Sequence, residues 1–228
     1  MKKLVLLALA AVSAVLFALP AVASAGEWEV DPAGVTFTAV NSGITVLTTS
    51  NNETVTCTGS SGSGAYNATS KTTGTIELSF TGCTESVFGS SCSNTATAGK
   101  ITTTTVTFTN EYVTDNKTSP GVTLKGTGAE EHFATFTCAS GGVEIKVTGT
   151  VMGQLEANEC GTTSTTHKLE FNSISHGVQE HTKVTGTGTS IYDLSARVKT
   201  IFGTNTYTAS QDGTGILTFS QAATVTCV

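Results

Sequence analysis

The sequence predicts an all-β protein, an antiparallel β-sandwich (or partly closed barrel) of roughly a dozen strands that disulfides stabilise. Three observations support this class. Thr makes up about one residue in five, and 24 Gly accompany only three Pro; Thr is β-branched and favours strands, while Gly interrupts them. Short stretches alternate apolar and polar residues between turn signals. Finally, all six Cys lie beyond the first 56 residues, and their number is even.

Residues 1–25 have the three parts of a secretory signal peptide. Lys2 and Lys3 carry positive charge, residues 4–19 are apolar, and small residues end the segment at Ala25. The apolar run is short for a membrane-spanning helix. We therefore expect cleavage before Gly26, a secreted or extracellular mature chain with no membrane span, and one β-sandwich domain over residues 26–228.

The first half of the mature chain contains several strand patterns. Apolar and polar residues alternate in 35–39, 54–57 and 76–80, and a further strand is expected at 44–47. Residues 59–71 are rich in Gly, Ser and Asn and are predicted to form a loop. Ile101 is out of step with Val106 and Phe108, which predicts a β-bulge in the Thr run between them.

The clearest strand pattern is a hairpin from His132 to Val151. Ala134, Phe136 and Cys138 alternate with polar residues before the turn at 139–142, and the following strand alternates in the same way. One face is therefore expected to be buried. The other face is predicted to be ordinary polar sheet surface without a deep pocket, and it carries Thr135, Thr137, Glu144, Lys146 and Thr148.

The remaining strands are predicted after Gly161. They cover residues 169–171, 192–198, the neighbourhood of Tyr207, 216–219 and 224–227. No sustained change in composition marks a linker between these strands and the earlier ones.

The cysteines are expected to form structural disulfides, because an exported chain with an even number of Cys is typically cross-linked. Six Cys allow 15 connectivities. Cys83 and Cys92 enclose a short loop and are predicted to pair; Cys57–Cys138 and Cys160–Cys227 are favoured for the rest. Zinc binding is the alternative, but no CxxC spacing supports it.

The charge distribution argues against nucleic acid as a partner. The net charge is −6, and Lys and Arg are scarce, so neither a phosphate backbone nor an anionic lipid surface has a basic patch to bind. The expected partner is an unidentified extracellular or cell-envelope component.

Candidate catalytic and metal-binding groups are sparse. His176, Glu180 and His181 could hold a divalent metal only if their segment forms a loop, and a solvated polar loop explains them equally well. Glu144 and Glu170 lie on predicted strands but alternate with buried residues, as solvated carboxylates do. No GxSxG motif occurs. We therefore expect no catalytic, cofactor-binding or metal-binding residues, and no cofactor.

Two local patterns resemble known proteins. Ala134-x-Phe136-x-Cys138, with Val55-x-Cys57, resembles the paired Cys strands of immunoglobulin-like sandwiches, although Phe replaces the corner Tyr and no Trp follows Cys57. Phe80-x-Gly82-Cys83 followed by Cys92 is similar, together with the later hairpin, to a group of uncharacterised secreted proteins of soil bacteria. That group implies no activity.

These observations favour a non-catalytic extracellular or cell-surface protein with a structural or adhesive role. The alternative is a secreted carbohydrate-binding module or hydrolase that acts on an extracellular polymer. Ice binding by the Thr arrays at 102–109 and 204–208 would require a constant short repeat, which the sequence lacks.

Overall fold

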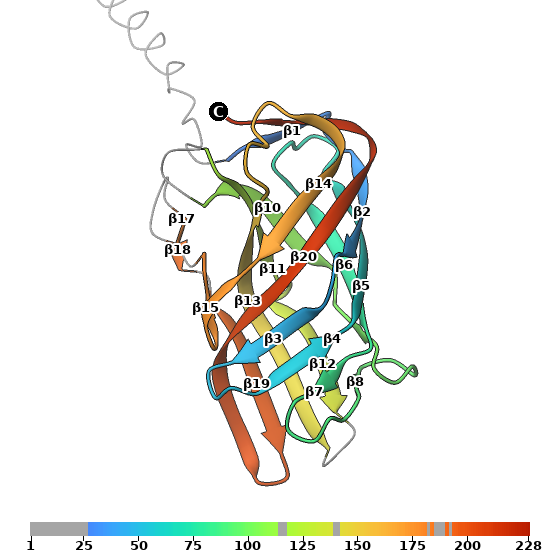
Figure 1. Cartoon of the computed structure of the whole chain (residues 1–228), viewed down its shortest axis with the longest axis vertical. Coiled ribbons are helices and arrows are strands. Elements are labelled where there is room, and N and C mark those ends of the chain that lie inside the picture. The colour runs from blue at the N-terminus through green and yellow to red at the C-terminus, as the bar shows by residue number, and fades with distance from the viewer. Residues whose placement is uncertain (1–26, 114–117, 139–141, 182, 185–189, 192) are drawn as a thin grey trace, which may run out of the picture.

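The computed structural model describes residues 27–113, 118–138, 142–181, 183–184, 190–191 and 193–228. The predicted signal peptide, the turn residues 139–141 and Tyr192 lie outside these ranges. The described chain contains no helix, and therefore none that is long and apolar enough to cross a membrane. Sixteen of its strands form one sheet in which all pairings are antiparallel (Figure 1), so the predicted all-β class is confirmed.

The sheet closes on itself in one half of the molecule, which we call the closed section. Eight strands follow one another there in the hydrogen-bonded order β20-β2-β5-β6-β10-β11-β13-β14, and β14 pairs again with β20. These strands are β2 (Thr36–Asn41), β5 (Gly59–Tyr66), β6 (Thr73–Thr81), β10 (Val106–Tyr112), β11 (Pro120–Lys125), β13 (Val143–Leu155), β14 (Thr163–Phe171) and β20 (Gly203–Thr226).

The other half, the second section, uses the first parts of the same long strands β13 and β20. Its order is β7-β4-β3-β20-β19-β13-β12-β8. Its further strands are β3 (Thr45–Thr49), β4 (Thr54–Cys57), β7 (Thr84–Glu85), β8 (Cys92–Ser93), β12 (His132–Cys138) and β19 (Leu194–Thr200). Figure 1 shows β20 running along almost the whole molecule, which joins the two sections.

Six short strands complete the described chain. β1 pairs with the end of β20, β9 pairs with β6, and two separate hairpins form from β15 with β16 and from β17 with β18. Their bounds are β1 (Glu29–Asp31), β9 (Ile101–Thr102), β15 (Ser173–Ser175), β16 (Val178–Gln179), β17 (Lys183–Val184) and β18 (Ser190–Ile191).

The segment predicted to be a loop at 59–71 is largely a strand, so that prediction is wrong. β5 occupies Gly59–Tyr66 and pairs on both sides, with β2 and with β6. Its glycines make room for neighbours: a Cβ at Gly64 would lie 2.5 Å from Cζ of Phe37. The Gly-rich composition therefore reflects close approach of a large inward side chain rather than turn formation.

The bulge predicted in the Thr run is confirmed. Five residue steps separate Ile101 from Val106, whereas only four separate their partners Phe80 and Ile76 on β6. The segment thus contains one extra residue relative to β6, in the break between β9 and β10. The central hairpin also forms as predicted, with Phe136 and Ile145 buried. A second irregularity between His132 and Ala134 leaves Phe133 buried as well, against the simple alternation.

The disulfide connectivity differs from the prediction in two of three pairs. Cys57 is bonded to Cys83 and Cys92 to Cys138, whereas Cys160–Cys227 forms as expected. The strand register explains the two corrections. Thr56 faces Thr84 where β4 pairs with β7, and Cys138 directly faces Cys92 where β12 pairs with β8. No cysteine is free.

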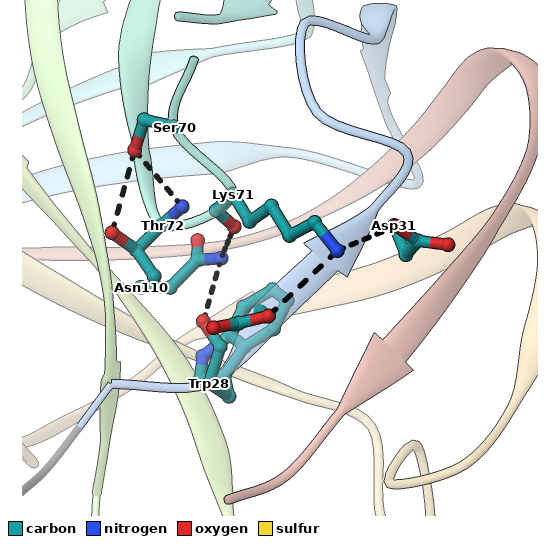
Figure 2. A network of polar contacts seen from close by, with 7 residues as sticks. Trp28, Asp31, Ser70, Lys71, Thr72 and Asn110 are labelled. Carbon is teal, nitrogen blue, oxygen red and sulfur yellow. Dashed lines mark hydrogen bonds and ion pairs between the residues drawn. The ribbon is translucent and has the colours of Figure 1, made fainter. Parts of the chain in front are cut away.

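A buried amide fixes the N-terminal strand to the body of the fold (Figure 2). The side-chain Nδ2 of Asn110, which is fully buried, donates to the carbonyl oxygens of Trp28 (3.1 Å) and Lys71 (3.2 Å). Its Oδ1 accepts a hydrogen bond from the Tyr66 hydroxyl at 3.0 Å. Lys71 in turn forms an ion pair with Asp31 at 2.6 Å. The hydrogen bonds of Asn110 satisfy polar groups that would otherwise be buried unpaired, whereas the Lys71–Asp31 ion pair lies at the surface.

Candidate functional site

The described surface exposes its two most accessible phenylalanines at one end of the molecule. Val87 and Phe88 lie in the loop between β7 and β8, and Ile201 and Phe202 form the turn between β19 and β20. β7 and β19 both run toward this end, since the antiparallel pairings link β7, β4, β3, β20 and β19 in turn. We call these four residues the apolar end.

The turn of the β19–β20 hairpin has an unusual composition. Ile201 is 82% exposed and Phe202 is 94% exposed, between the paired residues Thr200 and Gly203. Two-residue hairpin turns favour Asn, Asp and Gly, because these residues suit the backbone conformation. Neither backbone geometry nor burial therefore accounts for a large apolar pair at this turn.

The second apolar loop is held in place by one carboxylate. Glu85 accepts hydrogen bonds from the backbone amides of Val87 (2.6 Å), Phe88 (3.0 Å) and Ser90 (3.0 Å). The Ser86 amide also donates to the Thr54 carbonyl, and the Ser86 hydroxyl accepts from the Thr54 amide. The loop is thus ordered while Phe88 remains 70% exposed, and a preorganised loop loses less entropy when it binds a partner.

The same hydrogen bonds shift the titration of Glu85. Desolvation acts to raise its pKa, but the hydrogen bonds donated by Ser90, Phe88 and Val87 outweigh this effect and lower the pKa below its usual value of 4.5. The carboxylate form that holds the loop is therefore favoured.

Two exposed cations lie on β19 behind the apolar turn. Arg197 and Lys199 occupy outward positions on this strand, and their partners across the β13 pairing are Lys146 and Glu144, respectively. Lys146 is additionally paired with Glu130. The apolar turn between β19 and β20 thus has polar and charged side chains behind it.

The polar residues considered in the sequence are not gathered into one site. His176 is exposed at the β15–β16 turn, and His181 lies 3.9 Å from Glu180. Glu170 pairs with Lys168 at 2.5 Å. A further surface carboxylate, Glu131, pairs with Lys125 at 2.8 Å. Among the described residues, no group of three or more His, Cys, Asp or Glu could hold a metal ion.

One histidine stands apart from the others because it is buried. His167 is 3% exposed, and its Nδ1 lies 2.7 Å from Oε2 of Glu159. Its ring packs edge-on against Phe219 at a centroid distance of 5.4 Å. A sequence signal for this burial exists, because His167 shares a strand face with Leu169 and Phe171. The contacts anchor the loop before β14 and bring no nucleophile to the ring.

The apolar end is not among the sites predicted from the sequence, where only polar residues in the turns were candidates. The available signal was an apolar pair placed beside Gly in each turn, Val87-Phe88-Gly89 and Ile201-Phe202-Gly203. Comparisons with protein-family models, curated proteins and solved structures found no match for this chain.

Proposed function

We propose that this chain is a non-catalytic, exported protein with a structural or adhesive role at the cell surface or after release from it. The observation that carries the proposal is the apolar end, where Phe88 and Phe202 are presented to solvent on ordered turns. Large exposed apolar side chains that neither fold nor turn geometry requires are typical of interaction sites. Its partner is an extracellular or cell-envelope component with apolar surface.

The strength of such attachment follows from the area that contact would bury. Complete burial of a Phe or Ile side chain contributes about 1.5–3 kcal/mol. Part of this gain offsets the freedom lost on association, so a single copy is expected to bind weakly. Many copies on one surface would together attach firmly, because each additional contact is then intramolecular.

Adsorption to a chemically defined surface tests the proposal. Mature protein, residues 26–228, is passed over octylsilane-coated and bare silica sensors, and the adsorbed mass is measured on a microbalance. Wild type is expected to adsorb preferentially to the coated sensor. The double variant Phe88→Ser/Phe202→Ser is expected to lose most of this preference, because the apolar contact area is removed.

The matched control is Ile174→Ser, since Ile174 is an equally conspicuous apolar residue, 69% exposed, on β15. This variant should adsorb like wild type. If Ile174→Ser and the double variant lose the preference for the coated sensor equally, adsorption is nonspecific hydrophobic binding. The assignment of adsorption to the apolar end would then be wrong.

A second candidate function, carbohydrate binding, is favoured by a different surface. An open trough on the outer wall of the closed section is bordered largely by hydroxyl side chains, with Glu77 as its carboxylate. The hydroxyl residues are Thr36, Thr38, Ser63, Thr75, Thr105, Thr218 and Ser220. Hydroxyl groups both donate and accept hydrogen bonds, as sugars do.

A pulldown against cellulose, chitin and peptidoglycan separates the two functions. Binding to one polymer that Thr38→Val/Thr218→Val abolishes, and Phe88→Ser/Phe202→Ser leaves intact, would favour the carbohydrate-binding module. A hydrolase would in addition release soluble sugar from that polymer.

A further inference from the structure

The space between the inward faces of the sheet is incompletely filled. A cavity of about 180 Å³ lies there, bordered by strands of both sections. Apolar side chains make up most of its wall; examples are Phe37, Leu78, Phe136, Leu169 and Leu194. No Asp, Glu, Lys, Arg or His of the described chain borders it. It shares no residue with the apolar end.

The burial pattern of β6 reflects this empty space. Ile76, Leu78 and Phe80 lie on the same face of the strand because their positions differ by two. Ile76 is 6% exposed, whereas Leu78 and Phe80 are only half-buried although they face inward. Both border the cavity. Their incomplete burial means that apolar surface remains for another molecule to cover.

Two hydroxyls of the cavity wall are not available to a ligand. Thr45, at the start of β3, borders the cavity, but its Oγ1 is inaccessible even to a water-sized molecule. The Tyr66 side chain also borders the cavity, and its hydroxyl is already bonded to Asn110.

The cavity reaches the surface where the two sections meet. Val40 and Ser61 face each other on β2 and β5, both are exposed, and both border the cavity. Thr214 and Gly215 of β20 border it beside them. A small molecule would enter the cavity between these residues.

We infer that the cavity binds a small, neutral, apolar molecule. The volume sets the size class, because an apolar cavity of about 150 Å³ accommodates benzene. The absence of charged groups from the wall excludes ions, whose burial without a partner is very costly. This inference is independent of the adhesive role.

Two probes of equal size test both parts of the inference. p-Cresol and p-xylene differ only in a hydroxyl that replaces a methyl group. Binding to methyl-labelled mature protein is followed by NMR and calorimetry. Both probes are expected to shift the methyl signals of Leu78 and Leu194 but not those of Leu155, which is buried outside the cavity wall. p-Xylene should bind more tightly than p-cresol, because burial of a hydroxyl without a hydrogen-bond partner costs free energy.

Three variants complete the test. Ala134→Leu and Ala39→Leu add volume to the cavity wall from different strands, and either one, if folded, should abolish binding of both probes. Thr45→Val, which keeps the shape and changes only the inaccessible hydroxyl, should leave the binding of both probes unchanged.

The outcomes are decisive in each direction. If neither probe shifts the cavity methyl signals at millimolar concentration, or if a folded filling variant still binds, the site does not exist. If p-cresol binds more tightly than p-xylene, the apolar character assigned to the ligand is wrong. Should both filling variants fail to fold, the wild-type shifts and the comparison of the two probes decide.

Discussion

A single carboxylate determines how one of the two apolar turns is presented. Glu85 accepts three backbone amides of its own loop, and hydrogen bonds to a charged acceptor are stronger than neutral ones. The sequence does not identify this role of Glu85, because a Glu in a Gly/Ser-rich loop is equally compatible with a solvated side chain. Only the backbone path, which turns the amides of residues 87–90 toward the carboxylate, distinguishes the two cases.

The loop should therefore lose its order in acid. The pKa of Glu85 is lowered in the folded protein, so its stabilising contribution is fully present above the usual pKa of 4.5 and is lost as pH falls through the lowered value. NMR amide shifts of Val87 and Phe88 between pH 7 and pH 3 report this transition. Glu85→Gln should produce the disordered loop already at pH 7 and reduce adsorption to octylsilane.

The control for this prediction is Glu77→Gln, which changes an exposed strand carboxylate whose described contact is the Thr105 hydroxyl. It should leave the Val87 and Phe88 amides unchanged. If those amides keep their shifts in Glu85→Gln, the carboxylate does not organise the loop.

A strand could be predicted from the sequence only where its own inward-facing residues are large and apolar. The hairpin around β12 and β13 was predicted because large apolar residues alternate with polar ones. β5 was missed because its inward positions, Gly62 and Gly64, carry no side chain: the apolar groups above them come from Leu78 and Phe37. A strand whose burial is supplied by its neighbours leaves no hydrophobic period of its own to detect.

This view of β5 predicts the effect of adding one methyl group. In Gly64→Ala, the new Cβ would lie 2.5 Å from the Phe37 ring and 2.7 Å from the Thr75 carbonyl oxygen. Overpacking of this kind typically costs about 1–3 kcal/mol. The neighbouring Ser63→Ala changes an exposed outward position and should have little effect. Urea denaturation compares the two variants; equal stabilities would contradict the inward role of Gly64.

For the whole molecule, the sequence predicted the all-β class and one of the three disulfides, Cys160–Cys227, but not how the other four cysteines pair. Loop length favoured Cys83–Cys92, yet strand register decides the matter: Cys92 lies directly opposite Cys138 in the β8–β12 pairing. Register depends on contacts between segments far apart in the sequence, which local patterns do not encode. The cavity escaped prediction for the same reason, because its wall combines strands from both sections.

The disulfides differ in the length of chain that they close, and this difference predicts their effects on stability. Cys160–Cys227 spans 67 residues, whereas Cys57–Cys83 spans 26. The chain-entropy estimate gives about 4.4 and about 3.5 kcal/mol, respectively. Replacing both cysteines of one bridge by Ala should therefore destabilise the protein more for the longer bridge.

The longer bridge also holds the end of β20, where β1 and β14 both pair with it. Hydrogen exchange should accelerate first in those strands when it is removed. Guanidinium denaturation of the two double variants measures their free energies of unfolding. A larger loss of stability for the Cys57/Cys83 variant than for the Cys160/Cys227 variant would contradict the entropic argument.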